Sequence, residues 1–281
     1  MRDSAAKLLL YRQSLRQKVF RELARRLHLL SYEQRIEYSA IDRPHYGYCV
    51  LQAAKLAAKL GHRKVSVIEF GVAGGNGLLN LEMHAVEAKR ITGVDVQIFG
   101  FDTGRGLPPP TDYRDLPYHW KAGFFAMNVS KLQAQLKTAQ LVIGDVADTV
   151  ASFAQKYSPA PIGALLMDLD YYSSTKHALT LLDLNRSALL PRTFMYFDDI
   201  IGDDIALYSE YTGVRLAINE FNAGHAQQKI GDLPHLWMMP GAETWRHQIY
   251  VCHDFSHPDY CRFVSDEQQQ LPLRSSGRVE G

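Results

Sequence analysis

A short apolar run that ends in a cluster of glycines is the feature that most constrains the fold. Residues 65–70 read Val-Ser-Val-Ile-Glu-Phe, and four glycines follow within residues 71–77. An apolar run of this length bounded by glycines is typical of a buried strand. Glycine lets the chain turn sharply and pass close to a ligand. In an open α/β sheet, ligands bind outside the carboxyl ends of such strands, so this stretch predicts a binding loop.

Extended and helical patterns alternate along most of the chain. We expect helices up to Leu60 and over residues 78–89, 174–184 and 214–222. We expect strands over residues 65–70, 96–101, 140–143, 163–167, 193–197, 236–239 and 248–253. This alternation predicts an α/β fold with a doubly wound, mostly parallel Rossmann-like sheet and helices on both faces.

The sequence divides into three expected parts. Residues 1–45 form an N-terminal helical extension, residues 46–264 the Rossmann-like domain, and residues 265–281 a polar tail expected to be disordered. Within the extension, residues 4–30 predict a basic amphipathic helix. We expect this helix to pack on its own domain or on a second copy of the chain in a homo-oligomer; contact with a membrane surface is less favoured.

Composition excludes several classes of protein. The formal net charge is +1, which gives no overall field for nucleic acid. No stretch reaches the ~18 consecutive apolar residues of a membrane-spanning helix, and no secretory signal is evident. With three cysteines in 281 residues, a disulfide scaffold is not expected and a cytoplasmic location is.

The glycine spacing distinguishes between nucleotide-binding motifs. The dinucleotide fingerprint fails because Ala73 and Asn76, or Asn80 in the other register, stand where glycines are needed, and no phosphate-binding Gly-Lys-Ser/Thr follows. The observed order, an acid followed by glycines, resembles the first motif of class I methyltransferases. That resemblance implies a loop around S-adenosylmethionine formed by Glu69, Gly71, Gly74, Gly75 and Gly77. The alternative is a tight strand-to-helix turn that binds nothing.

Two further acids follow predicted strands. Asp102 stands at the end of the strand after the glycine loop, where an acid can accept the ribose hydroxyls of a cofactor. Asp95 competes for this role but lies at the start of that strand. Asp145 follows the next strand, at the place where methyltransferases commonly contact adenine.

Two apolar strands about 30 residues apart both end in paired acids. Asp168 and Asp170 follow the first strand, and Asp198 and Asp199 follow the second. Carboxylates brought together at one sheet edge repel one another unless a proton or a cation intervenes. All-oxygen ligands suit Mg²⁺, Mn²⁺ or Ca²⁺. The alternative is that Asp168 or Ser173 caps the following helix.

The stretch from Asp168 to Thr175, followed by the Asp198-Asp199 pair, resembles the macrocin O-methyltransferase family, over roughly residues 43–251. The resemblance implies Mg²⁺-dependent methylation of sugar hydroxyls, with Asp170, Asp198 and Asp199 as metal ligands. Asp170 is also the expected catalytic base, a role that competes with metal binding. Leu169, Tyr171 and Ser173 depart from the family pattern, and residues 112–120 are not a feature of it, which leaves the substrate open.

The expected function is therefore O-methyl transfer to a sugar or glycosylated substrate, and no nucleic-acid partner is expected. Alternatives are a catechol- or phenol-type O-methyltransferase and a non-catalytic cofactor-binding protein. A haloacid-dehalogenase-type phosphatase ranks third because Tyr172 replaces the Thr or Val it needs. A zinc site over residues 252–261 has the right residue types but no second Cys-x2-Cys element.

The Pro-rich segment of residues 103–121 is long enough to be a lid or a binding element. Its aromatic residues Tyr113, Tyr118, His119 and Trp120 either stack on a sugar ring or close over the domain's own surface.

Overall fold

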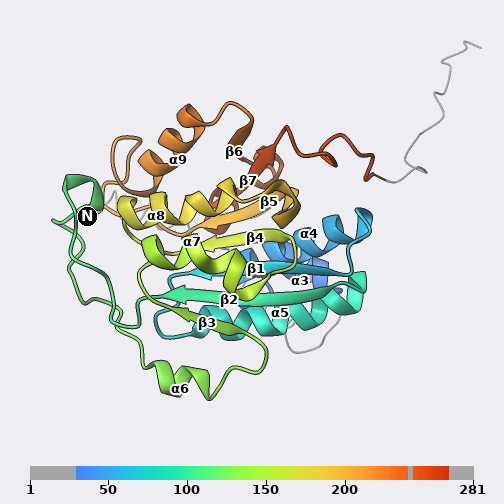
Figure 1. Cartoon of the computed structure of the whole chain (residues 1–281), viewed down its shortest axis with the longest axis horizontal. Helices are drawn as coiled ribbons and strands as arrows, with labels where there is room; N and C mark the ends of the chain where they lie inside the picture. Colours follow the sequence, from blue (N-terminus) through green and yellow to red (C-terminus); the bar gives the residue numbers. More distant parts are fainter. Residues whose placement is uncertain (1–29, 240–242, 266–281) are drawn as a thin grey trace, which may run out of the picture.

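The computed structural model describes residues 30–239 and 243–265. These residues form a seven-stranded sheet between two layers of helices (Figure 1). The helix expected over residues 4–30 falls almost wholly outside the described residues, as does the expected tail. The predicted α/β class and the doubly wound, mostly parallel sheet are confirmed.

The sheet has the strand order β3-β2-β1-β4-β5-β7-β6. Strands β1 to β5 pair in parallel, whereas β7 runs antiparallel to both β5 and β6. The strands span Lys64–Phe70 (β1), Asp95–Asp102 (β2), Gln140–Ile143 (β3), Ile162–Met167 (β4), Leu189–Phe197 (β5), Gln228–Asp232 (β6) and Ile249–Asp254 (β7).

Alternating side chains of the strands bury one core on each face of the sheet. In β1, Val65 and Val67 pack with the helices of one face, whereas Ile68 and Phe70 pack with those of the other. The first face carries α3 (Tyr32–Glu37), α4 (Pro44–Lys59) and α5 (Asn76–Thr92), and the second carries α7 (Val146–Tyr157), α8 (Tyr172–Leu179) and α9 (Gly213–Gly224). Two short helices, α6 (Val129–Gln133) and α10 (Pro234–Trp237), lie in connections.

Three details differ from the sequence prediction. The strand expected over residues 236–239 is wrong: Pro234 fixes the backbone for a helix start, and α10 forms there with Leu236 buried. The outer strand is β6 instead. The helix expected over residues 174–184 ends at Leu179 and continues as a 3-10 turn. Helix α7 was not predicted, although its buried residues recur at helical spacing.

The topology places a crevice at the carboxyl end of β1. The chain builds β2 and β3 on one side of β1 and then crosses to β4 on the other side. Ligands of open α/β sheets bind where the strand order reverses in this way. The long connection from β2 to α6, green in Figure 1, lies at the same end of the sheet.

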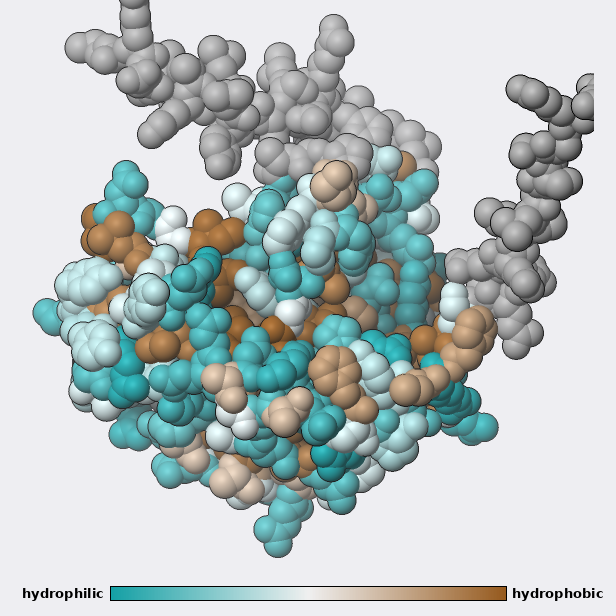
Figure 2. Space-filling model, turned by 90° about the horizontal axis from the view of Figure 1, so that it is seen from above, coloured by the Kyte–Doolittle hydropathy of each residue, from teal (hydrophilic) through white to brown (hydrophobic). Residues whose placement is uncertain are grey.

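The described surface is mixed in character. Figure 2 shows a largely hydrophilic surface on which apolar residues form separate patches. None of the described helices is long and apolar enough to cross a membrane.

Candidate active site

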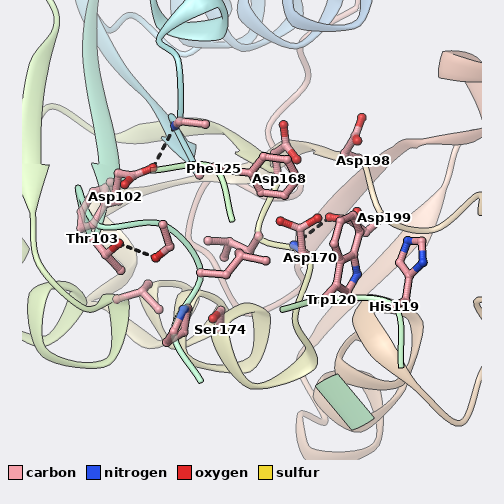
Figure 3. Close-up of a pocket in the computed structure, with 18 of the residues that line it drawn as sticks. Asp102, Thr103, His119, Trp120, Phe125, Asp168, Asp170, Ser174, Asp198 and Asp199 are labelled. Carbon is pink, nitrogen blue, oxygen red and sulfur yellow. Dashed lines mark hydrogen bonds between the residues drawn. The ribbon is translucent and has the colours of Figure 1, made fainter. Parts of the chain in front are cut away.

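A cavity of about 630 Å³ opens at the carboxyl ends of the parallel strands. Gly71, Ala73 and Asp102 line one side, and Asp168, Asp198 and Asp199 line another. Figure 3 shows Asp102 and the carboxylate cluster at opposite sides of this space, with Trp120 and His119 beside the cluster. The sequence-predicted loop and the predicted acids therefore meet in one cavity.

The glycines of the loop are required largely by the protein's own packing. A Cβ on Gly71 would lie 1.7 Å from the carbonyl oxygen of Asp168, and one on Gly77 would lie 1.7 Å from Oε1 of Glu69. Gly75 has a φ of +84°, which favours glycine. Of the predicted cofactor-binding glycines, only Gly71 lines the cavity, and contacts of Gly74, Gly75 and Gly77 with a cofactor stay predictions.

Asp102 holds the glycine loop in place. Its Oδ2 accepts hydrogen bonds from the backbone N–H groups of Val72 and Ala73, both at 2.9 Å, and its Oδ1 accepts one from Gly104 at 2.6 Å. A carboxylate has about four acceptor positions, so three N–H donors leave about one for a ligand. Asp95, the competing acid, lies at the start of β2 and forms an ion pair with Lys89. It is therefore at the sheet edge opposite the cavity, as the sequence predicted.

Asp145 lines the cavity and also caps α7. Its Oδ1 accepts a hydrogen bond from the backbone N–H of Ala147 at 2.9 Å. The N-terminal turn of a helix thus faces the side of the cavity where adenine was expected.

Glu69 lies beneath the glycine loop and not among the residues that line the cavity. Its Oε1 accepts a hydrogen bond from the Tyr46 hydroxyl at 2.8 Å, whereas the buried Oε2 has no hydrogen-bond partner within the described part of the chain. Burial, with a smaller contribution from the charge of Asp102, raises the pKa of Glu69 to about 8, although the Tyr46 hydrogen bond and the charge of Arg43 act in the opposite direction. A contact between Glu69 and the cofactor stays a prediction.

The carboxylates at the ends of β4 and β5 form one cluster. Asp168, Asp198 and Asp199 each offer an oxygen, and these oxygens lie within 4.8 Å of one another. Among the described residues, no other group of three or more His, Cys, Asp or Glu side chains converges in this way. Burial, followed by the neighbouring carboxylates, raises the pKa values of Asp168 and Asp199 well above their usual range.

Asp170, the expected metal ligand and base, lies outside this trio but lines the same cavity. Its backbone is left-handed, with a φ of 60°, and its N–H donates to Oδ2 of Asp199 at 2.9 Å (Figure 3). Burial, and then the charges of Asp168 and Asp198, raise the pKa of Asp170 to about 7.

Two tyrosine hydroxyls fix the acids at the end of β5. Tyr196 donates to Oδ1 of Asp198, and Tyr208 donates to Oδ1 of Asp199 at 3.2 Å. The three groups that converge are all carboxylates, and carboxylate oxygens are the ligands that Mg²⁺, Mn²⁺ or Ca²⁺ prefers. A cation would also relieve the repulsion among the trio, so these residues fit a hard divalent cation.

The long connection after β2 contributes aromatic side chains to the cavity. His119, Trp120 and Phe125 line it, whereas Tyr113 and Tyr118 do not. Tyr118 instead donates its hydroxyl to the carbonyl of Ala206 at 2.9 Å, which joins this connection to the loop after β5.

Sequence reasoning missed the contribution of the loop after β5. Ile201, Asp203, Ala206 and Tyr208 line the cavity, but no spacing pattern in that loop marks them. The discounted zinc pattern is not assembled: Cys252 is buried in β7, His253 pairs with the Tyr260 hydroxyl, and His257 bonds the carbonyl of Arg186.

Comparisons with known proteins agree with this architecture. No protein-family model and no curated protein matches the sequence. Among solved structures, the calicheamicin methyltransferase CalS11 is similar, with a TM-score of 0.50, 19% identity, and 90% of this chain and 91% of that chain covered. The O-methyltransferase NovP is similar with a TM-score of 0.50 and 15% identity over 75% of this chain and 79% of that chain. The chain has a methyltransferase-type Rossmann-like fold.

Proposed function

We propose that this chain is an S-adenosylmethionine-dependent O-methyltransferase that acts on a hydroxyl group of a sugar or a glycosylated small molecule. The shared cavity carries the proposal, because the glycine loop with Asp102 and the carboxylate trio line the same space. A methyl donor on one side and an acceptor hydroxyl on the other can then meet. Two neighbours of the same fold, named as methyltransferases, support this chemistry.

The side of the cavity formed by Gly71, Ala73 and Asp102 is the side that we assign to the cofactor. S-adenosylmethionine supplies an activated sulfonium methyl group, so the protein's task is to align it with the nucleophile, which can lower the barrier by roughly 7–11 kcal/mol in favourable cases. Asp102 fixes the loop at Val72 and Ala73 and keeps about one acceptor position for a ribose hydroxyl. Asp145 and the start of α7 border the same cavity.

The acceptor side supplies charge and a proton acceptor. Asp168, Asp198 and Asp199 would hold the divalent cation, which lowers the pKa of an acceptor hydroxyl and orients it. Asp170 lies outside the trio and lines the cavity, so its carboxylate is the group we assign to accept the hydroxyl proton. This assignment separates the two roles that compete for Asp170 in the resemblance to the macrocin family.

The first test is thermal unfolding with S-adenosylhomocysteine, with and without Mg²⁺, and with NAD as the control. A ligand at 100 times its Kd stabilises the folded state by about 2.7 kcal/mol, which is measurable. We expect stabilisation by S-adenosylhomocysteine and none by NAD. Stabilisation by NAD alone would refute the proposed cofactor.

The second test is transfer of a labelled methyl group to a panel of glycosides, free sugars and catechols. Transfer to glycosides or sugars supports the proposal, and transfer only to catechols favours the phenol-type alternative. Cofactor binding without transfer to any acceptor favours a non-catalytic binding protein.

A further inference from the structure

The connection between β2 and α6 contains one fully buried carboxylate, Asp115. Its Oδ1 accepts a hydrogen bond from the backbone N–H of Ser173 at 2.8 Å. Its Oδ2 accepts from the Ser173 hydroxyl at 2.9 Å and from the backbone N–H of Thr111 at 2.8 Å. A buried carboxylate is tolerated when such donors satisfy it, and this arrangement ties the connection to another part of the chain.

Ser173 is the second residue of α8, and this helix has no side-chain cap of its own. Tyr171, at the N-cap position, makes no capping hydrogen bond. Asp115 therefore performs from 58 residues away the task that a local Asp or Ser normally performs. Capping of this helix by Asp168 or Ser173, the alternative to a metal site in the sequence analysis, is not found among the described hydrogen bonds.

Helix α8 begins at Tyr172, two residues after Asp170, so Asp115 links the connection to the acceptor side of the cavity. A neighbouring contact strengthens the link. The guanidinium of Arg114 lies 4.4 Å from the ring centroid of Tyr172 and donates to its hydroxyl at 2.9 Å.

A tight turn at Leu116 connects Asp115 to two of the side chains that line the cavity. Leu116 is fully buried and has a left-handed backbone with a φ of 55°. Its carbonyl accepts hydrogen bonds from the N–H groups of His119 at 2.9 Å and Trp120 at 3.0 Å. His119 and Trp120 both line the cavity beside the carboxylate cluster (Figure 3).

We propose that Asp115 is a positioning residue for the methyl acceptor: by capping α8 it holds Trp120 and His119 over the carboxylate cluster, where they contact the acceptor. This inference rests on the proposed function, because it assigns an acceptor to that side of the cavity. The donor side does not depend on Asp115, since Asp102 holds the glycine loop independently.

Steady-state kinetics of Asp115→Asn and Ser173→Ala test the proposal. Asn keeps the shape of the Asp115 side chain but cannot accept all three hydrogen bonds. Ser173→Ala removes only the bond from the Ser173 hydroxyl, so this milder variant still tests the contact if Asp115→Asn fails to fold. We expect kcat/KM for the acceptor to fall by about ten- to 100-fold for Asp115→Asn, because small misplacements cost about that much. Ser173→Ala is expected to act in the same direction with a smaller effect. The Kd of S-adenosylhomocysteine stays unchanged in both.

Asn128→Ala is the matched control, because Asn128 caps α6 from the same connection without contacting α8. We expect acceptor kinetics like those of the native protein. A double variant with Trp120→Ala provides a second readout: if Asp115 acts through Trp120, adding Asp115→Asn to Trp120→Ala causes little further loss. Full additivity, or an equal loss of S-adenosylhomocysteine binding, overturns the proposal.

A fluorescence measurement separates this inference from the proposed function. The chain has three tryptophans, and the variants Trp237→Phe and Trp245→Phe together leave Trp120 as the reporter. In that background, Asp115→Asn is expected to make Trp120 more accessible to acrylamide, and unchanged quenching overturns the positioning role. If the native chain methylates no acceptor, the proposed function fails while the quenching result still decides whether Asp115 positions Trp120.

Discussion

The substitution Gly71→Ala tests whether the glycine loop and the end of β4, which leads into Asp168, pack as one unit. Gly71 has a φ of +83°, and an added Cβ would lie 1.7 Å from the carbonyl oxygen of Asp168. The adjacent backbone is held by the hydrogen bonds from Asp168 N to Phe70 O and from Gly71 N to Phe101 O, both 2.9 Å. Because the obstructing atom belongs to the backbone, it cannot rotate away, and the ends of β1 and β4 must separate.

The cost has two parts. A non-glycine residue in the left-handed region costs roughly 1–2 kcal/mol, and forcing an extra methyl into a packed site costs typically about 1–3 kcal/mol. The sum is a loss of about 2–5 kcal/mol in the free energy of unfolding. At about 2 °C per kcal/mol for a domain of this size, the melting temperature falls by roughly 4–10 °C. The same separation moves the loop, so affinity for S-adenosylhomocysteine falls as well.

Gly74→Ala is the matched control in the same loop. No atom of residues 30–239 or 243–265 lies within 4 Å of a Cβ built on Gly74, and its φ is outside the left-handed range. We expect its melting temperature to stay within about 1–2 °C of the native value, because substitutions away from special features change stability by about 0.5 kcal/mol or less. Calorimetry of the three proteins decides the matter. Equal melting temperatures for Gly71→Ala and Gly74→Ala would refute the packing argument.

Three further predictions follow from the site. Asp102→Asn leaves three backbone N–H donors facing a neutral amide, so calorimetric titration should show affinity for S-adenosylhomocysteine reduced about tenfold or more; unchanged affinity contradicts this. Asp168→Asn removes one of the converging carboxylates, so Mg²⁺ should no longer raise the melting temperature, whereas Asp95→Asn should keep the Mg²⁺ effect. Burial raises the pKa of Glu69 from about 4.5 to about 8, so the folded state holds this proton more tightly and its contribution to stability falls as pH rises through that range. Urea unfolding between pH 4.5 and 8 should show that the free energy of unfolding depends less on pH in Glu69→Gln than in the native protein. Identical pH dependence in the two proteins would contradict this prediction.

Much of the fold follows from local patterns that need no tertiary information. Apolar runs such as residues 65–70 identify strands because parallel strands are covered on both faces. Acids directly after such runs, Asp102 above all, were placed at the correct edge because ligands of open α/β sheets bind at the carboxyl ends of the strands. The strand expected over residues 236–239 failed because a short apolar run does not distinguish a strand from a buried helical turn.

The composition of the carboxylate cluster could not be read from the sequence. Asp168 and Asp170 both follow β4, and the resemblance favoured Asp170 as the ligand. The structure brings Asp168 into the trio, whereas the chain turns left-handed at Asp170 and the N–H of Asp170 donates to Asp199. That turn depends on a partner 29 residues away, and no local propensity encodes such a partner.

The same kind of bond recurs at three places around the cavity. Asp102 accepts N–H groups of the glycine loop, Asp115 accepts one from the start of α8, and Asp199 accepts one from the turn after β4. Each bond joins segments that are distant in sequence, so together they fix the loops relative to one another through the protein's own contacts. A site ordered in advance loses less conformational freedom on binding. These bonds also make the role of each acid hard to predict from sequence alone. An acid that accepts backbone hydrogen bonds and an acid that binds a ligand occupy equivalent places at the strand ends.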